Sequence, residues 1–248
     1  MIRSQLLLGV ALFAAPLVAP PANAQVTIQI GGGVGVMSPT ADFGGSTIDY
    51  YFGQRYGLSS GITLQGKARV GLLGITLAGE IAYASLSNDG NSEPGQGRVE
   101  VSQKILSFKF GPEFHLHAPL VPFTPYAGAN IAINRFSGET TFQGVSKVPS
   151  AVYSVQSASR FGIGITGGVL VKISPLVSLD AGLAYNLMNI GGKGWEDVNP
   201  FQEKRIDSYL ALNDANDPLF QPGNDDHIVG SDRTINSFQV SVSVLFRL

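Results

Sequence analysis

The chain has 248 residues, a formal net charge of −2 at pH 7 and no cysteine. The lack of cysteine excludes disulfide bonds and thiolate chemistry, and the near-neutral charge argues against nucleic acid as a partner. After residue 24, no apolar run approaches the roughly 20 residues that a membrane-spanning helix requires.

The N-terminus has the three parts of a secretory signal peptide. Arg3 supplies a basic start, Leu6–Val18 an apolar centre, and Ala22–Ala24 a small-residue cleavage motif. The sequence therefore predicts a signal peptide at residues 1–24 and an exported mature domain at residues 25–248, in a bacterial cell.

From residue 26 onward, apolar and polar residues alternate in eight segments. Because successive side chains of a strand point to opposite faces, each segment predicts a strand with one apolar and one polar face. Most have about 12 to 14 residues, at or above the roughly 9 to 11 that cross a bilayer when tilted. The predicted strands are Val26–Met37, Ser60–Leu72, Ile75–Leu86, Glu100–Leu116, Phe123–Phe136, Arg160–Ile173, Val177–Asn189 and Ser237–Leu248.

The connections between these segments alternate in length. Those after the second, fourth and sixth segments are short turns, whereas the others are longer and polar. The four longer connections are 38–59, 87–98, 138–158 and 191–236. Antiparallel outer-membrane barrels have this asymmetry, with short periplasmic turns and longer outer loops.

The charged residues of the strands favour a barrel whose apolar face contacts lipid. The centre of every apolar face lacks charge, whereas a soluble barrel would have a dry apolar interior and a charged exterior. Charges inside a narrow barrel must pair, because an unpaired buried charge is costly. The predicted interior polar network is Lys67, Arg69, Glu80, Lys109, Glu113, Lys172 and Asp180, with Arg247 on the same face and Arg160 at one rim.

One ion pair follows from turn geometry. If the chain reverses at residues 73–74, Lys67 and Glu80 are equally distant from the turn and face each other inside. Lys109 and Glu113, neighbours on one strand face, would extend this network.

Aromatic residues on the apolar faces predict two interfacial girdles. Phe238 and Phe246 are eight residues apart, which at about 3.3 Å per residue and a tilt near 40° is roughly 20 Å along the membrane normal. The predicted outer girdle is Tyr83, Phe161, Tyr185 and Phe238, and the predicted inner girdle is Phe114, Phe123 and Phe246.

Two cations keep the outward parity but lie beyond the outer girdle. Lys104 and Arg135 would meet lipid phosphates there rather than acyl chains. The alternative is that they are ordinary charges of the barrel rim.

The signal peptide, the eight alternating strands, the sequence PFTPYAGANIA from Pro122 and the final alternating strand resemble the small eight-stranded bacterial outer-membrane proteins. This OmpA/OmpX-like group often carries the label porin family. The resemblance implies an all-β, antiparallel, up-and-down transmembrane β-barrel in the outer membrane of a Gram-negative cell. It also implies contact with outer-membrane lipid and lipopolysaccharide, insertion by the barrel-assembly machinery, and a monomer. The chain departs from the family at Leu248, where relatives usually end in Phe or Trp, and this bears on the strength of the assembly signal rather than on the fold.

Candidate catalytic and metal-binding residues are few. His115 and His117 form an H-x-H pair that can hold zinc or copper, but no third ligand is near in sequence, and His227 lies in an acidic loop. Some barrels modify lipid A with a Ser and a His on the lipid side near the outer leaflet. His115 and His117 have interior parity and lie at the opposite end, so we expect no catalytic residue, no metal and no cofactor.

The expected function is a side-chain-plugged scaffold that presents polar loops at the cell surface for envelope integrity or surface contact. Two alternatives stay open: a lipid A-modifying outer-membrane enzyme and a narrow channel. The predicted interior has six cations against three anions, counting Arg160 and Arg247, so such a channel would weakly favour anions.

Overall fold

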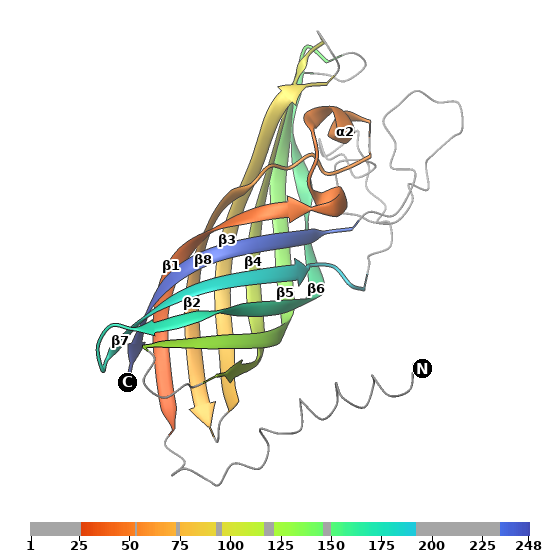
Figure 1. The fold of residues 1–248 in the computed structure, drawn as a ribbon. Coiled ribbons are helices and arrows are strands. Elements are labelled where there is room, and N and C mark those ends of the chain that lie inside the picture. The colour runs from red at the N-terminus through yellow and green to blue at the C-terminus, as the bar shows by residue number, and fades with distance from the viewer. Residues whose placement is uncertain are drawn as a thin grey trace, which may run out of the picture.

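The strands close into a barrel in which each pairs antiparallel with its neighbour in sequence and β8 pairs with β1 (Figure 1). The computed structural model describes residues 26–52, 54–72, 75–92, 96–116, 122–145, 150–191 and 234–248. The strands are β1 (Thr27–Thr40), β2 (Gly61–Leu72), β3 (Ile75–Asn91), β4 (Arg98–His115), β5 (Phe123–Gln143), β6 (Ala151–Lys172), β7 (Val177–Leu187) and β8 (Asn236–Arg247). The predicted eight-stranded antiparallel barrel is therefore confirmed, whereas the predicted signal peptide lies outside the described residues. In the described ranges no helix has the length and hydropathy needed to cross a membrane.

Along β8 and the adjoining parts of the other strands, the barrel has an apolar exterior and a polar interior. On β8, Phe238, Val242 and Phe246 are exposed, whereas Ser243 is buried. Leu245, which breaks the alternation, is buried inside against Tyr126 and Leu170. Because outward rows of the other strands are equally apolar, the exterior is a continuous hydrophobic surface of the kind that contacts lipid.

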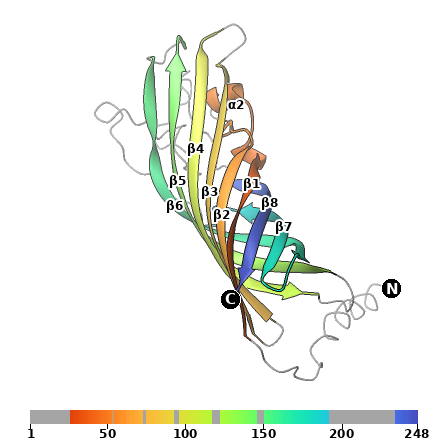
Figure 2. The ribbon, with the colours of Figure 1, turned by 90° about the vertical axis from the view of Figure 1, so that its left-hand side faces the viewer.

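Four strands are longer than predicted. β3 and β4 cover half of the predicted loop 87–98, and β5 and β6 cover most of 138–158. In Figure 2 these strands rise together beyond the ends of β1, β2, β7 and β8. We call this extension of β3–β6 the outer wall.

The sequence did not predict the outer wall, because its polar and apolar faces are exchanged relative to the rest of the barrel. On β4, Val99 and Val101 face inward and are buried, whereas Arg98 and Glu100 face outward and are exposed. Strand alternation continues, but the apolar side chains now lie on the inner face. A polar outer face is what water requires, so the exchange marks the level at which the strands leave the lipid.

The inner face of the outer wall is covered by the connection between β1 and β2. This connection contains the 3₁₀-helix η2 (Ala41–Phe43) and the short helix α2 (Thr47–Tyr51). A capping box between Ser46 and Asp49 fixes the start of α2, because each side chain accepts a hydrogen bond from the backbone N–H of the other. Figure 1 shows α2 beside the upper part of the sheet.

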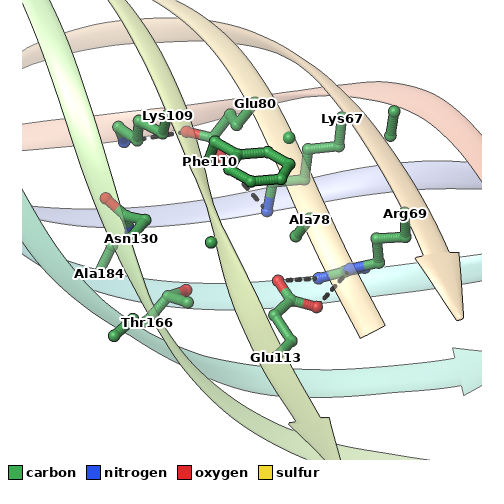
Figure 3. Close-up of a pocket in the computed structure, with 14 residues that line it drawn as sticks. Lys67, Arg69, Ala78, Glu80, Lys109, Phe110, Glu113, Asn130, Thr166 and Ala184 are labelled. Carbon is green, nitrogen blue, oxygen red and sulfur yellow. Dashed lines mark hydrogen bonds and ion pairs between the residues drawn. The ribbon is translucent and has the colours of Figure 1, made fainter. Parts of the chain in front are cut away.

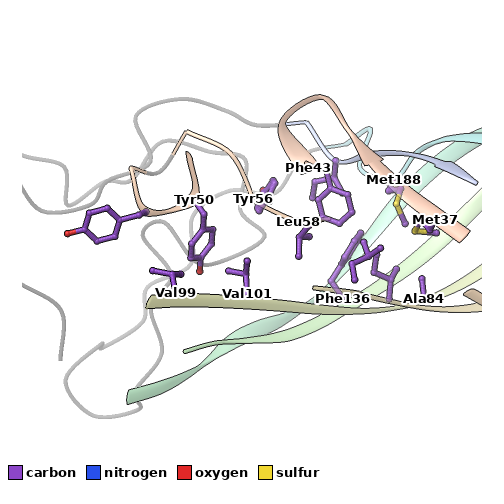
Figure 4. Packing of buried hydrophobic residues seen from close by; sticks show 14 of the residues in the cluster. Met37, Phe43, Tyr50, Tyr56, Leu58, Ala84, Val99, Val101, Phe136 and Met188 are labelled. Carbon is purple, nitrogen blue, oxygen red and sulfur yellow. The ribbon is translucent and has the colours of Figure 1, made fainter. Parts of the chain in front are cut away.

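Side chains from this connection, from β3–β6 and from the adjacent ends of β1, β7 and β8 form an apolar cluster, which we call the outer core (Figure 4). Phe43 is 0% exposed and packs edge-on against Tyr56 and Phe136, with ring centroids 5.7 and 6.2 Å away. The Tyr50 hydroxyl lies 2.7 Å from Thr140 Oγ1 on β5. The outer core comprises Met37, Phe43, Tyr50, Tyr51, Tyr56, Leu58, Ala84, Leu86, Val99, Val101, Ile105, Phe136, Phe142, Val145, Met188 and Ile235.

The closing contact between β1 and β8 depends on glycine. A Cβ atom on Gly33 would overlap the carbonyl oxygen of Val242 and the side chain of Ser243. We expect Gly33→Ala to destabilise the barrel by about 1 to 3 kcal/mol or more, because lipid does not tolerate the open edges that failed closure would leave. Urea unfolding in lipid vesicles, followed by heat-modifiable gel migration, measures the loss.

The matched control is Gly79→Ala, because a Cβ atom at Gly79 has no neighbour within 4 Å among the described residues. This variant should unfold at or slightly above the urea concentration of the unaltered protein. If Gly33→Ala and Gly79→Ala unfold at the same urea concentration, the strands β1 and β8 do not approach each other as closely as described.

Candidate functional site: the charged barrel interior

Six of the predicted interior residues converge in the lipid-spanning part of the barrel. Inward parity aims all six at the barrel axis, and the strand register places Lys67 opposite Glu80 and Glu80 opposite Lys109. The six are Lys67 and Arg69 on β2, Glu80 on β3, Lys109 and Glu113 on β4, and Asp180 on β7.

Arg69 is the most enclosed cation of this set, at 1% exposure. Its Nε lies 2.7 Å from Glu113 Oε2 and its Nη2 3.1 Å from Glu113 Oε1, so the guanidinium donates to both oxygens in the bidentate geometry (Figure 3). Its Nη1 lies 3.2 Å from Asp180 Oδ2. The guanidinium also stacks over the Tyr126 ring, 4.6 Å from the centroid, which adds a cation–π contact.

The two lysines connect the remaining carboxylates. Lys67 Nζ lies 3.0 Å from Asp180 Oδ2 and 3.6 Å from Glu80 Oε2. Lys109 Nζ donates to Glu80 Oε1 at 2.9 Å and to Gln239 Oε1 at 3.1 Å. The six residues therefore form one chain of alternating charge, running from Lys109 through Glu80, Lys67, Asp180 and Arg69 to Glu113.

Two interior residues were not assigned to this network by the sequence. The Tyr126 hydroxyl donates to Asp180 Oδ1 at 2.8 Å, and His115 Nε2 lies 3.1 Å from Glu113 Oε2. The His115 ring stacks on Tyr126, with centroids 5.5 Å apart. The available signal was the large aromatic residue Tyr126 among small residues on an inward face.

The other predicted interior cations lie elsewhere. Lys172 is exposed at the end of β6, Arg160 is buried at the level of Asn134, and Arg247 donates to Thr27 Oγ1 at 3.2 Å. Parity gives the face of a side chain but not its depth, so Lys172 points inward where the barrel opens to solvent. The connected network has three cations and three anions. Lys172 is the one member of the predicted polar network that forms no ion pair among the described residues. The predicted ratio of six cations to three anions on the inward faces, and the weak anion preference drawn from it, stay predictions.

Uncharged polar side chains fill the next level toward the outer core. Gln65 Nε2 donates to Ser243 Oγ at 2.8 Å, and Gln239 Nε2 donates to Gln65 Oε1 at 2.8 Å. Asn134 accepts from Ser107 Oγ at 2.7 Å and donates to the Met188 carbonyl at 2.9 Å. Among the charged residues lies a cavity of about 40 Å³, room for a water molecule or two.

The residues of the two predicted aromatic girdles all lie exposed on the outward face. Tyr185 faces Phe238 across β7 and β8. Tyr83 lies within β3 rather than at its end, because β3 continues to Asn91. Their interfacial role stays a prediction.

Among the histidines, His115 is inside the barrel, and His117 and His227 lie outside the described residues. Across the described ranges, no group of three or more His, Cys, Asp or Glu side chains is placed to hold a metal ion.

A closed barrel with an apolar exterior and a charged, paired interior defines a transmembrane β-barrel protein. A family model described as outer membrane protein beta-barrel domain matches residues 6–246. The chain belongs to this family and is located in the outer membrane. No curated protein matches the sequence.

Solved structures of outer-membrane barrels are similar to this chain. Neisserial surface protein A is 17% identical with a TM-score of 0.49, over 92% of this chain and 100% of that one. Ail, the attachment invasion locus protein of Yersinia pestis, is 13% identical with a TM-score of 0.41, over 92% and 100%. A major outer membrane protein from Thermus thermophilus is 13% identical with a TM-score of 0.49, over 90% and 100%. At these identities the likeness concerns the fold alone.

Proposed function

We propose that the protein is a non-conducting outer-membrane scaffold that presents an ordered polar surface outside the cell, for envelope integrity or surface contact. The observation that carries this proposal is the filling of the barrel interior. The charged chain, the polar level around Gln65 and Gln239, and the outer core follow one another along the axis. A hydrated ion needs a continuous passage, and the cavity of about 40 Å³ among the charges is too small to supply one.

The outer wall supports the surface role. Its outer face carries Arg98, Glu100 and Glu139, all exposed, and its inner face is held by the outer core. A sheet with its own apolar core keeps its shape without lipid around it. The barrel therefore serves as an anchor and the wall as the presented surface.

The remaining parts of the proposal concern partners. The apolar exterior extends around every strand, which suits a monomer surrounded by outer-membrane lipid and lipopolysaccharide. Insertion by the barrel-assembly machinery is proposed from membership in the barrel family. Enzymatic modification of lipid A gains no support from His115, because its ring lies in the barrel interior rather than on the lipid side.

Planar bilayer recordings test the proposal. We expect the purified protein to give no steady single-channel current, because paired side chains fill the lumen. Heat-modifiable migration of the same preparation is the control, since it shows that folded barrels were present. A steady current, with or without anion selectivity, would contradict the closed lumen.

A further inference from the structure

We propose that the outward face of β4–β6 binds one molecule of lipid A. Its phosphate lies between Lys104 and Arg135, and one of its acyl chains lies in an apolar groove further down the same strands. The proposal concerns the exterior of the barrel and is independent of whether the lumen conducts.

The phosphate site is a pair of neighbouring cations on the outward faces of β4 and β5. Lys104 on β4 faces Ser137 on β5, and Arg135 faces Leu106, so the two cations are diagonal neighbours. Diagonal outward side chains of paired strands lie about 7 to 8 Å apart at their backbones, within reach of one phosphate. Both are exposed, and neither takes part in an ion pair among the described residues.

The outward neighbours of this pair are hydroxyl groups and one diagonal carboxylate. Along β4 and β5 the nearest outward carboxylates are Glu100, four residues from Lys104 on the same strand, and Glu139, which lies diagonal to Lys104 on the side away from the lipid. Hydroxyl groups flank the cations on the neighbouring strands: Ser85 pairs with Lys104 on one side, and Ser159 pairs with Arg135 on the other. These hydroxyls can donate further hydrogen bonds to phosphate oxygens.

The depth of the pair is that of lipid headgroups. Below it on the same faces come Leu106 and Ile133, and above it the faces are polar. Lys104 and Arg135 therefore lie at the level where the strands leave the lipid. A cation at that level is adjacent to headgroup phosphates.

An apolar groove of about 590 Å³ lies further down these strands. Its lining combines small residues, Ala129, Gly111 and Gly164, with larger apolar side chains. Its lining residues are Phe110, Gly111, Pro112, Ala129, Asn130, Ile131, Ile163, Gly164, Ile165, Tyr185 and Leu187. Most of these face outward, so the groove opens toward the lipid.

The groove and the cation pair are joined by one apolar path. On β5 the outward residues after Arg135 are Ile133, Ile131 and Ala129. At about 3.3 Å per residue, Ile131 is roughly 13 Å from Arg135 along the strand, within the span of one fatty acyl chain. A phosphorylated, multiply acylated lipid matches both ends of this path. A second copy of the chain fits less well, because it would bring the same cations against one another.

Native mass spectrometry of the barrel, extracted in mild detergent from vesicles of zwitterionic phospholipid and lipid A, tests the proposal. We expect one lipid A molecule to be retained per monomer. The double variant Lys104→Gln/Arg135→Gln should retain it about tenfold less or weaker still, and Ala129→Leu, which fills the groove, should also weaken retention. Lys172→Gln removes an exposed cation elsewhere and is the matched control.

Two further arms distinguish the source of the anion. For lipid A stripped of its phosphates, we expect the unaltered protein and the double variant to retain equal amounts. Inorganic phosphate alone should not displace bound lipid A. The proposal is overturned if Lys172→Gln and the double variant retain lipid A equally. It is also overturned if Ala129→Leu abolishes a dimer instead of a bound lipid. Because the two glutamine substitutions are on the surface, the double variant should fold even if the Ala129→Leu variant does not.

Discussion

Replacing Arg69 by methionine is expected to lower the free energy of unfolding of the barrel by about 3 to 5 kcal/mol. The cost arises because the Arg69 guanidinium is the bidentate partner of Glu113 and also contacts Asp180, which is 0% exposed. Without it, these carboxylates keep only Lys67, Tyr126 and His115 as partners in the network. Urea unfolding in lipid vesicles measures the change.

Arg98→Met is the matched control for this prediction. Arg98 also forms an ion pair, with Asp89, but the two side chains are 58% and 62% exposed. An exposed pair contributes about 0 to 1 kcal/mol. Equal destabilisation by the two substitutions would show that the interior pairs are no more important than surface ones.

Phe43→Ala is expected to remove about 3 to 5 kcal/mol from the packing of the outer core, while the lipid-spanning barrel stays closed. The Phe43 ring is fully buried between Tyr56 and Phe136. Once this ring is lost, the connection between β1 and β2 should detach from the outer wall. The readout is cleavage by trypsin after the exposed Arg55, followed by mass spectrometry.

Phe52→Ala provides the comparison, because Phe52 lies in the same connection and is 47% exposed. We expect it to leave the rate of tryptic cleavage after Arg55 nearly unchanged, and heat-modifiable migration should be retained in both variants. Cleavage at the same rate in Phe43→Ala and Phe52→Ala would mean that the outer core does not hold this connection.

Much of the barrel could be predicted from the sequence, because its determinants are local. Alternation fixed the outward face of every strand, and counting from the turn at 73–74 placed Lys67 opposite Glu80, as the register shows. The pairing of β8 with β1 followed from the need to close the sheet in lipid.

Contacts across the lumen could not be predicted in this way. Arg69 on β2 reaches Asp180 on β7, and these strands are not neighbours in the sheet. Such contacts depend on side-chain length and on the width of the lumen, which no strand register specifies. For the same reason Lys67→Met is expected to cost less than the roughly 3 to 5 kcal/mol of breaking an isolated buried pair, since Glu80 keeps Lys109 and Asp180 keeps Arg69.

The outer wall and the outer core could not be predicted from the sequence, because single strands pass from lipid into water along their length. Val99, Val101 and Phe142 are apolar residues at inward positions, the opposite of the pattern that identifies lipid-facing strands. Their partners Tyr50 and Tyr56 lie in a connection that looks polar and glycine-rich. The available signal was the set of buried-type aromatic residues in that connection.

The barrel therefore has two interiors suited to two solvents. At the level where lipid surrounds the barrel, the interior is a chain of paired charges. At the level where water surrounds it, the interior is an apolar core. The exterior changes from apolar to polar near Lys104 and Arg135. This exchange along β3–β6 is what allows one continuous sheet to serve as both anchor and presented surface.

Spin labels along β4 test this account most directly, since single-cysteine variants can be made in a chain that has no cysteine. Labels are placed at the outward positions from Arg98 to Phe114, with Ser107 as an inward control, in protein reconstituted into vesicles. From Leu106 to Phe114 we predict accessibility to oxygen but not to a water-soluble nickel chelate, and from Arg98 to Ser102 we predict accessibility to the nickel chelate. Access of the nickel chelate to labels at Phe108 and Phe110 would contradict the account, because that face would then lie in water.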